Sequence, residues 1–182
     1  MAESNNHNPK NNPVGFLILG VLVFGLIVMI GVWMTKPSAA SLEIGKQAPD
    51  FSLTSFENKA YTLSEYQGKV VLINFWASWC TSCDEEGLMF QEIWKELEPG
   101  GDYLFLGVDY VDTEDPALKY ISEHAITYPN GPDLGAAISK MYGITGVPET
   151  FLIGKDGTLK AIQIGPFASS EEIRTFLAKA DQ

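Results

Sequence analysis

The sequence predicts an α/β fold with a central mixed sheet flanked by helices, preceded by one transmembrane helix. Two apolar, β-rich runs, Lys69–Ala77 and Tyr103–Tyr110, are typical of strands buried on both faces of a sheet. A helical pattern follows each run, and a hairpin and a last helix close the chain, as in an α/β domain. The uncharged stretch Val14–Met34 predicts the transmembrane helix.

This uncharged stretch has the length of a membrane span. Its 21 residues would form a helix about 31 Å long, and a hydrocarbon core is roughly 30 Å thick. A secretory h-region is shorter, about 7–15 residues, but the small residues of "KPSAAS" leave signal-peptide cleavage as an alternative. We expect an uncleaved signal-anchor, with a cytoplasmic head over residues 1–13, the transmembrane helix over 14–35, a linker over 36–46 and the folded domain over 47–182.

The charges bear on orientation and on partners. Lysines lie on both sides of the span, so orientation is inferred from the short polar head and the large domain behind the span. This arrangement predicts a single-pass protein of the cell membrane with its domain on the extracytoplasmic side. The first 35 residues carry one acid and one base, so the whole net charge of −11 belongs to the rest. With Arg174 as the only arginine and no basic run, nucleic-acid binding is disfavoured.

The other elements are predicted from local signals. Strands follow from β-branched and aromatic runs, helix starts from capping residues, and helix ends from proline and glycine. The first part of the domain should hold strands over Phe51–Thr54 and Ala60–Leu63, a capped helical turn from Ser64, and a helix from Cys80 with apolar positions Leu88, Phe90, Ile93, Trp94 and Leu97. The second part should hold helices capped at Asp115 and Asp133, a hairpin turning at Lys155–Gly157, and a closing helix with a capping box from Ser169 to Glu172.

Cys80 and Cys83 are the only cysteines and form a CxxC motif. As a structural disulfide they would close a very short loop, which stabilises a fold by about 2 kcal/mol, against about 4.7 kcal/mol for a 100-residue loop. A structural zinc site needs about four ligands, and His7 and His124 lie far away in the sequence. Covalent haem attachment needs CxxCH, whereas Asp84 follows Cys83 here.

A redox-active pair fits the motif better than these alternatives. The cysteines lie where a predicted buried strand ends and a helix begins, so Cys80 falls at a helix N-terminus, where free N–H groups and the dipole stabilise a thiolate. Cys83 lies one turn inside, within reach of a mixed disulfide at Cys80. We expect Cys80 to be the exposed nucleophile and Cys83 the resolving thiol of a redox-active disulfide, with no other cofactor.

Several motifs resemble a known family. "NFWASWCTSC" resembles the thioredoxin active-site segment, and "GKQAPDFSL" with "YTLSEYQGKVVLINFWASWC" resembles the ResA/TlpA/CcmG (DsbE) family of membrane-anchored, thioredoxin-like thiol:disulfide oxidoreductases. "GITGVPETFLI" is similar to a signature of that family in which the proline, here Pro148, is cis and faces the dithiol. The resemblance covers Gly45 to about Ala180 and implies a thioredoxin fold.

The resemblance also implies a function. Members of this family act as reductants in cytochrome c maturation, so the expected client is the CxxCH segment of apocytochrome c or a relay protein. The expected electron donor is a membrane thiol transporter of the CcdA/DsbD type. The dipeptide between the cysteines, Thr81-Ser82, matches neither common pair of the family, which leaves the choice of partner open.

A proton acceptor follows from the same resemblance. Thioredoxins carry a buried aspartate two residues before the active-site tryptophan, where this chain has Asn74, and in this family a glutamate three residues after the second cysteine stands in. The matching residue is Glu86, which helical spacing places on one face with Cys83. A partly buried carboxylate with a raised pKa could take the Cys83 proton, and its charge would favour a reductant. Asp84 and Glu85 are interpreted as solvated residues of the first helical turn.

The remaining candidate site residues would bind the client. Trp79 adjoins the CxxC motif, and Val147 would offer its backbone to an extended client strand, as in thioredoxins. Pro148 would face the dithiol. Glu149 follows it and would lie either near the dithiol or in solvent.

Two other functions compete with a reductant. "APDFSL" also opens peroxiredoxins, but a peroxidatic site needs a proline and a threonine or serine shortly before the cysteine, and an arginine nearby. "NFWASWC" has no proline, and Arg174 is the only arginine. A non-catalytic docking module with an idle dithiol is the second alternative, which mutation of both cysteines would separate from an oxidoreductase.

Overall fold

The computed structural model describes residues 22–26, 29 and 42–181 of the 182-residue chain. The chain divides into two units, Met1–Ala39 and Ala40–Gln182, which are described separately. In the first unit, residues 22–26 are helical. Within the described parts of the chain, no helix is long and apolar enough to cross a bilayer. The predicted head, most of the predicted signal-anchor and half of the linker lie outside the described residues, so these remain predictions.

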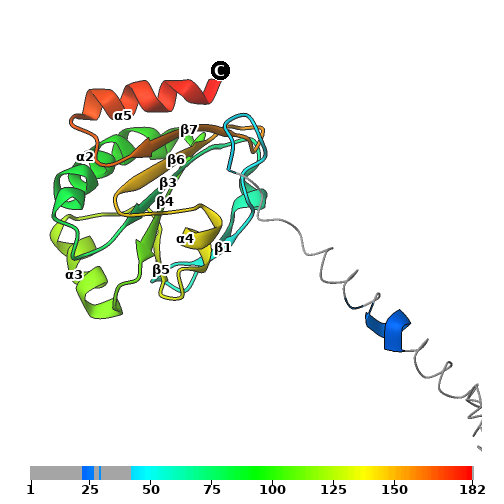
Figure 1. Cartoon of the computed structure of the whole chain (residues 1–182). Helices are drawn as coiled ribbons and strands as arrows, with labels where there is room; N and C mark the ends of the chain where they lie inside the picture. The colour runs from blue at the N-terminus through cyan, green and yellow to red at the C-terminus, as the bar shows by residue number, and fades with distance from the viewer. Residues whose placement is uncertain (1–21, 27–28, 30–41, 182) are drawn as a thin grey trace, which may run out of the picture. The chain divides into compact units, whose positions relative to one another are not determined.

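The second unit is built on a five-stranded mixed sheet with the strand order β5-β4-β3-β6-β7 (Figure 1). Strands β3, β4 and β5 are parallel to one another, β6 is antiparallel to β3, and β7 is antiparallel to β6. Two short strands form a separate antiparallel ladder. The bounds are β1 Ser52–Thr54, β2 Ala60–Thr62, β3 Val70–Trp76, β4 Tyr103–Tyr110, β5 Asn130–Asp133, β6 Glu149–Ile153 and β7 Leu159–Ile164.

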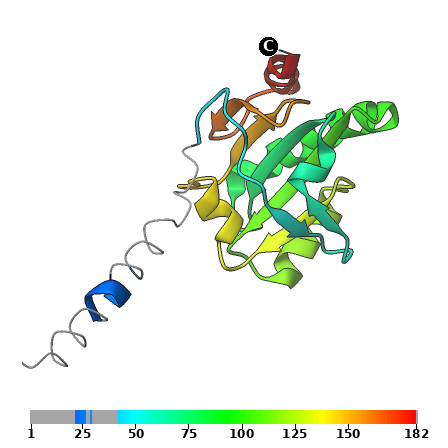
Figure 2. The ribbon, with the colours of Figure 1, turned by 90° about the vertical axis from the view of Figure 1, so that its right-hand side faces the viewer.

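Helices cover the sheet on both faces. The helices are α2 (Thr81–Leu97), α3 (Glu114–Glu123), α4 (Ala137–Met141) and α5 (Ser170–Leu177). Side chains of α2, α3 and α5 share one hydrophobic cluster, and α5 lies beside α2 in both views (Figure 1 and Figure 2). Side chains of α4 join a second cluster with β1 and β2.

Strand β3 shows how the sequence produces these two layers. All seven of its residues are buried, and successive side chains point to opposite faces of a sheet. Val70, Leu72 and Trp76 therefore belong to the cluster with α2, whereas Val71 and Ile73 belong to the cluster with α4. The continuous apolar run thus gives a strand that two layers cover, as predicted.

Most predicted elements are confirmed. Strands β3 and β4, the β6–β7 hairpin and the closing helix lie where the sequence placed them. Ser169 caps α5, because its hydroxyl accepts a hydrogen bond from the Glu172 backbone N–H over 3.3 Å. The N-cap residue of α4 is Ala136 and not the predicted Asp133, which ends β5. The Asp133 carboxylate nevertheless accepts bonds from the N–H groups of Ala137, Ile138 and Ser139 at the start of the helix.

Other predictions are wrong in detail. Leu88 does not face the core, because its side chain is 53% exposed on α2. Helix α3 begins at Glu114, after the cap residue Thr113, and so one residue before Asp115. Strand β5 was not predicted, since its sequence "NGPD" is typical of a turn.

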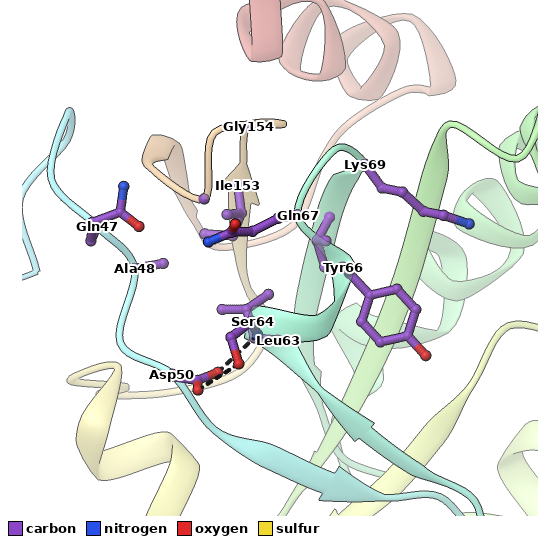
Figure 3. Close-up of a pocket in the computed structure, with 12 residues that line it drawn as sticks. Gln47, Ala48, Asp50, Leu63, Ser64, Tyr66, Gln67, Lys69, Ile153 and Gly154 are labelled. Carbon is purple, nitrogen blue, oxygen red and sulfur yellow. Dashed lines mark hydrogen bonds between the residues drawn. The ribbon is translucent and has the colours of Figure 1, made fainter.

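The helical turn after β2 is also arranged differently from the prediction. It is a 3-10 helix over Leu63–Tyr66, which begins before Ser64, so Ser64 is not its cap. Instead the backbone N–H and the hydroxyl of Ser64 donate to Asp50 over 2.9 and 2.8 Å (Figure 3). These bonds line a small pocket at the end of the sheet where β3 begins, which is the end remote from the cysteines. The bonds between Ser64 and Asp50 therefore attach the segment before β1 to the domain at this pocket.

Candidate active site

The two cysteines lie at the junction of β3 and α2. Strand β3 ends at Trp76, and Cys80 is the N-cap residue of α2 in extended conformation, as predicted. Cys80 and Cys83 form a disulfide with their Cα atoms 5.4 Å apart. Cys80 is 5% exposed and Cys83 is 1% exposed. The prediction of an openly exposed nucleophile is therefore wrong for this oxidised form, although Cys80 is the more accessible of the two.

The Cys80 sulfur faces the loop before β6. It lies 3.6 Å from the carbonyl oxygen of Val147, and the Val147–Pro148 peptide bond is cis, as the resemblance implied. A disulfide sulfur carries no proton, so this contact becomes a hydrogen bond only when Cys80 is a thiol. On the other side the sulfur lies 3.4 Å from the Ser82 hydroxyl, which can donate to it. Val147 is half-buried and thus borders both the sulfur and the surface.

Trp79 is the most exposed aromatic residue beside the dithiol. It directly precedes Cys80 and its side chain is 59% exposed. An indole that remains in solvent next to a reactive sulfur offers a flat apolar surface to another protein. Its position agrees with the predicted role in client binding.

Glu86 is buried under the first turn of α2. It is 1% exposed, and its carboxylate accepts hydrogen bonds from the Asn74 amide over 3.1 Å and from the Phe167 backbone N–H over 3.2 Å. Burial raises the pKa of Glu86 from 4.5 to about 7, while the bonds from Phe167 and Asn74 act in the opposite direction. The structure thus explains the raised pKa expected for Glu86, because its carboxylate is buried. Asn74 also donates to the Thr150 hydroxyl, so it ties Glu86 to β6.

Glu149 begins β6 and is not in solvent. It is 4% exposed, and one carboxylate oxygen accepts bonds from the Thr145 N–H, the Thr145 hydroxyl and the Gly146 N–H over 3.0 to 3.2 Å. These bonds hold the loop that presents Val147 to Cys80. The structure thus gives Glu149 a supporting contact with the loop that precedes the cis-proline.

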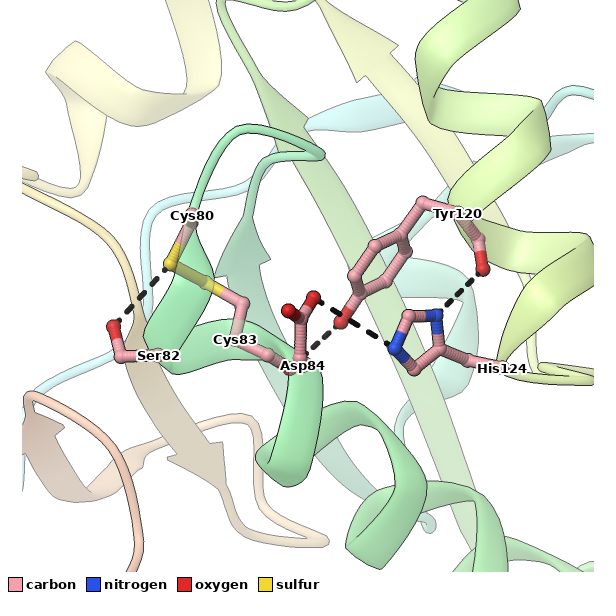
Figure 4. Close-up of polar contacts among 6 residues, drawn as sticks. All are labelled: Cys80, Ser82, Cys83, Asp84, Tyr120 and His124. Carbon is pink, nitrogen blue, oxygen red and sulfur yellow. Dashed lines mark hydrogen bonds and ion pairs between the residues drawn. A yellow bond between two sulfur atoms is a disulfide. The ribbon is translucent and has the colours of Figure 1, made fainter.

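The two acids that precede Glu86 differ from each other. Glu85 is exposed, as predicted. The Asp84 side chain is half-exposed and lies 3.7 Å from the Nε2 atom of His124, which is the C-cap residue of α3 (Figure 4). His124 is therefore a helix-end residue that joins α3 to the beginning of α2.

Two further acids near the site were missed by the sequence analysis. Asp112 accepts hydrogen bonds from the Ser78 and Thr113 N–H groups, both over 2.7 Å, and so fixes the loop that leads to Cys80. Asp109 lies opposite Trp76 in the sheet, is 1% exposed, and neither carboxylate oxygen has a hydrogen-bond partner among the described residues. Burial, with the nearby charge of Asp112, raises the pKa of Asp109 to about 7. The signal that could have found it is an acid inside an apolar strand.

Metal ligands are also part of the geometry of a site. Within the described ranges, no group of three or more His, Cys, Asp or Glu side chains is arranged to hold a metal ion. The groups that the structure brings together are the dithiol, the cis-proline loop and the buried carboxylates. Together these groups can exchange a disulfide and move a proton.

The chain is similar to several known proteins. Residues 44–162 match the model of the AhpC/TSA family. The thiol-disulfide oxidoreductase ResA of Bacillus thuringiensis is 35% identical over 76% of this chain and 79% of its own length. The thiol:disulfide interchange protein DsbE of Pseudomonas aeruginosa is 32% identical over 84% of this chain and 82% of its own. A crystal structure of a thiol:disulfide interchange protein of the thioredoxin family from Chlorobium tepidum aligns with a TM-score of 0.66 at 25% identity, over 78% of this chain and 99% of the other, which confirms the thioredoxin fold.

Proposed function

We propose that the dithiol of this chain acts as a reductant. The chain belongs to the AhpC/TSA family and, within it, to the ResA- and DsbE-type thiol-disulfide oxidoreductases. The chain is a thiol-disulfide oxidoreductase, with Cys80 and Cys83 paired in a CxxC arrangement. The direction of electron flow, the client and the location are the proposed parts. The observation that carries the direction is the buried carboxylate of Glu86 in the turn that follows Cys83.

The exchange begins from the reduced dithiol. The Cys80 thiolate, at the N-terminus of α2, attacks one sulfur of a client disulfide, and the other client sulfur leaves as a thiolate that takes up a proton. The Cys83 thiol then loses its proton to Glu86 and attacks the Cys80 sulfur. The Cys80–Cys83 disulfide forms, the second client sulfur leaves, and it also takes up a proton. Two electrons have passed from the chain to the client, and the chain has reached the oxidised state of this structure.

Glu86 favours this direction of transfer. With a pKa of about 7, it is partly ionised near neutral pH and can both accept and return a proton there. When ionised, its charge opposes a thiolate on the same helix face, which raises the thiol pKa. A strong oxidant depends on a stabilised thiolate in its reduced form, so a destabilised thiolate favours a reductant.

The proposed client is the CxxCH segment of apocytochrome c, or a relay protein that carries its electrons. The client strand would lie along Val147, with Trp79 and Pro148 forming the apolar border of the contact. A membrane thiol transporter of the CcdA/DsbD type would return the chain to the dithiol state. The chain would be anchored by the single span predicted over 14–35, with the domain on the extracytoplasmic side. The resemblance of "GITGVPETFLI" to the family signature supports this assignment.

The family description also raises the peroxidase alternative. A peroxidatic cysteine needs an arginine beside it, and Arg174 lies on α5, where its guanidinium pairs with Glu96 over 2.8 Å. The segment from Asn74 to Cys80 contains no proline. These two observations favour disulfide exchange over peroxide reduction at Cys80.

A trapping experiment tests the client. In the Cys83→Ser variant of the full chain, a mixed disulfide at Cys80 has no resolving thiol, so the client stays attached and can be identified by mass spectrometry. We expect a protein with a CxxCH motif or a thioredoxin-like relay protein, bound at Cys80. The variant that lacks both cysteines is the control and should trap nothing. Trapping of a copper-binding protein or of a disulfide isomerase instead would contradict the role in cytochrome c maturation.

A further inference from the structure

Tyr120 contacts the backbone of the resolving cysteine. Its hydroxyl donates a hydrogen bond to the Cys83 carbonyl oxygen over 2.6 Å (Figure 4). In an α-helix this carbonyl also accepts the N–H of the residue four positions later, Gly87. A carbonyl oxygen has two lone pairs. The hydroxyl therefore uses the second one and links α3 to the first turn of α2.

Gly87 provides the space for this bond. A Cβ atom added at Gly87 would lie 2.6 Å from the Tyr120 hydroxyl oxygen, closer than real Cβ contacts. A glycine inside a helix costs about 1 kcal/mol relative to alanine. This less favourable helix residue lies at the turn of α2 where the Tyr120 hydroxyl approaches the helix backbone.

Tyr120 is itself held in place. It is 5% exposed and its ring stacks between Trp76 at 4.5 Å and His124 at 4.0 Å between centroids. Burial, with the charges of Asp84 and Glu86, raises the pKa of Tyr120 far above its usual value, so the hydroxyl remains protonated and donates. The donor thus has a fixed position and a fixed protonation state.

The first turn of α2 needs such an anchor. Its N-cap residue, Cys80, makes no side-chain capping bond. An uncapped helix start is less stable, by about 1 kcal/mol for a typical cap. In the oxidised form the disulfide holds this turn, but that constraint disappears when the dithiol forms. The bond from Tyr120 goes to the Cys83 backbone carbonyl, so it involves neither sulfur atom.

We propose that Tyr120 is a positioning residue for the resolving thiol. By holding the Cys83 backbone in the reduced protein, it keeps the Cys83 sulfur in reach of a mixed disulfide at Cys80. In the resolving step the Cys83 thiolate bonds to the Cys80 sulfur, the bond from Cys80 to the client breaks, and the client sulfur leaves with the electron pair. Preorganisation of this kind raises the effective concentration of one thiol at the other.

The reaction with 5,5′-dithiobis(2-nitrobenzoate) separates the two steps. Cys80 attacks the reagent and releases one coloured thiolate, and closure by Cys83 releases a second. In Tyr120→Phe we expect the second phase to be about tenfold slower and the first unchanged, as the loss of one hydrogen bond implies. The equilibrium constant for disulfide formation against glutathione should fall about tenfold, which for two electrons is about 30 mV toward a weaker reductant.

Gly87→Ala gives a second route to the same test, because its methyl group displaces the hydroxyl. It should reproduce the effect, and the double variant with Tyr120→Phe should show no further loss. Tyr142→Phe is the matched control, since Tyr142 is also buried and its hydroxyl donates to the Pro49 carbonyl over 2.9 Å in the other layer. Urea unfolding of each oxidised variant checks the fold.

The proposal is overturned if Tyr120→Phe folds and leaves both the second phase and the glutathione equilibrium within twofold of wild type. It is also overturned if Tyr142→Phe changes them as much, which would indicate general loosening. If Tyr120→Phe does not fold, Gly87→Ala decides by the same criteria. The assays use small disulfides, so they rest on the exchange activity alone and are independent of the proposed client.

Discussion

Replacing Glu86 with glutamine removes a carboxylate that the fold buries almost completely. Burial raises its pKa from 4.5 to about 7 in the folded protein, whereas in the unfolded chain it titrates near the ordinary value. Between these two pH values the folded protein holds a proton that the unfolded chain has released. The free energy of unfolding therefore falls as pH rises through this window.

The size of the effect follows from the two pKa values. A rise from 4.5 to about 7 corresponds to about 3 kcal/mol, because one pKa unit equals roughly 1.4 kcal/mol. This penalty is absent below the unfolded pKa and complete above the folded one. Glutamine carries no charge, so the difference in unfolding free energy between Glu86→Gln and wild type should move by about 3 kcal/mol in favour of the variant from pH 4 to pH 8.

Urea unfolding of the oxidised full chain measures this difference, because the disulfide removes the thiol titrations. Glu85→Gln is the matched control: its side chain is exposed one residue away, and it should show no comparable pH dependence. A difference for Glu86→Gln that stays constant within about 0.5 kcal/mol across the range, the scatter expected of surface substitutions, would refute a carboxylate with a raised pKa.

Two further substitutions probe the surroundings of the site. Asp109→Asn removes a buried carboxylate that has no hydrogen-bond partner among the residues that the structure describes and whose pKa is raised from 3.8 to about 7. The substitution should therefore stabilise the oxidised protein by up to about 4 kcal/mol at pH 8 and hardly at all at pH 3. Equal urea midpoints for variant and wild type at both pH values would contradict this. Asp133→Ala removes the carboxylate that accepts three N–H bonds at the start of α4 and the Ser139 hydroxyl bond, and should cost about 2–3 kcal/mol in thermal or urea unfolding. A loss below about 0.5 kcal/mol would show that this cap contributes little to stability.

The fold could be predicted where local patterns and tertiary structure agree. The apolar runs of β3 and β4 and the capping box at Ser169 report burial and helix ends directly. Strand β5 could not be read this way, because Asn, Gly, Pro and Asp are depleted in strands. It forms because it is an edge strand, where Pro132 is tolerated, and because Asn130 accepts a 2.8 Å hydrogen bond from the Trp76 indole across Gly107.

The residues of the site also fall into those that local sequence patterns predict and those that depend on tertiary packing. Cys80, Cys83 and Glu86 are close in sequence, so helix geometry predicts their arrangement. The contact from Tyr120 to Cys83 spans 37 residues, and it depends on the packing of α3 against α2, which no local pattern reports. The sequence places Asp109 in a strand, but its burial can be predicted only when it is known which face of β4 it lies on.

Electron transfer between the dithiol and a CxxCH disulfide shows directly whether the chain acts as a reductant. The reduced full chain is mixed with an equimolar peptide that carries an internal CxxCH disulfide, the mixture is quenched with acid, and both redox states are counted by mass spectrometry. We expect that most of the peptide becomes reduced while the Cys80–Cys83 disulfide forms, and that Cys80→Ser transfers no electrons. A peptide that stays oxidised, or a reduced peptide that the oxidised chain oxidises, would contradict the role as a reductant.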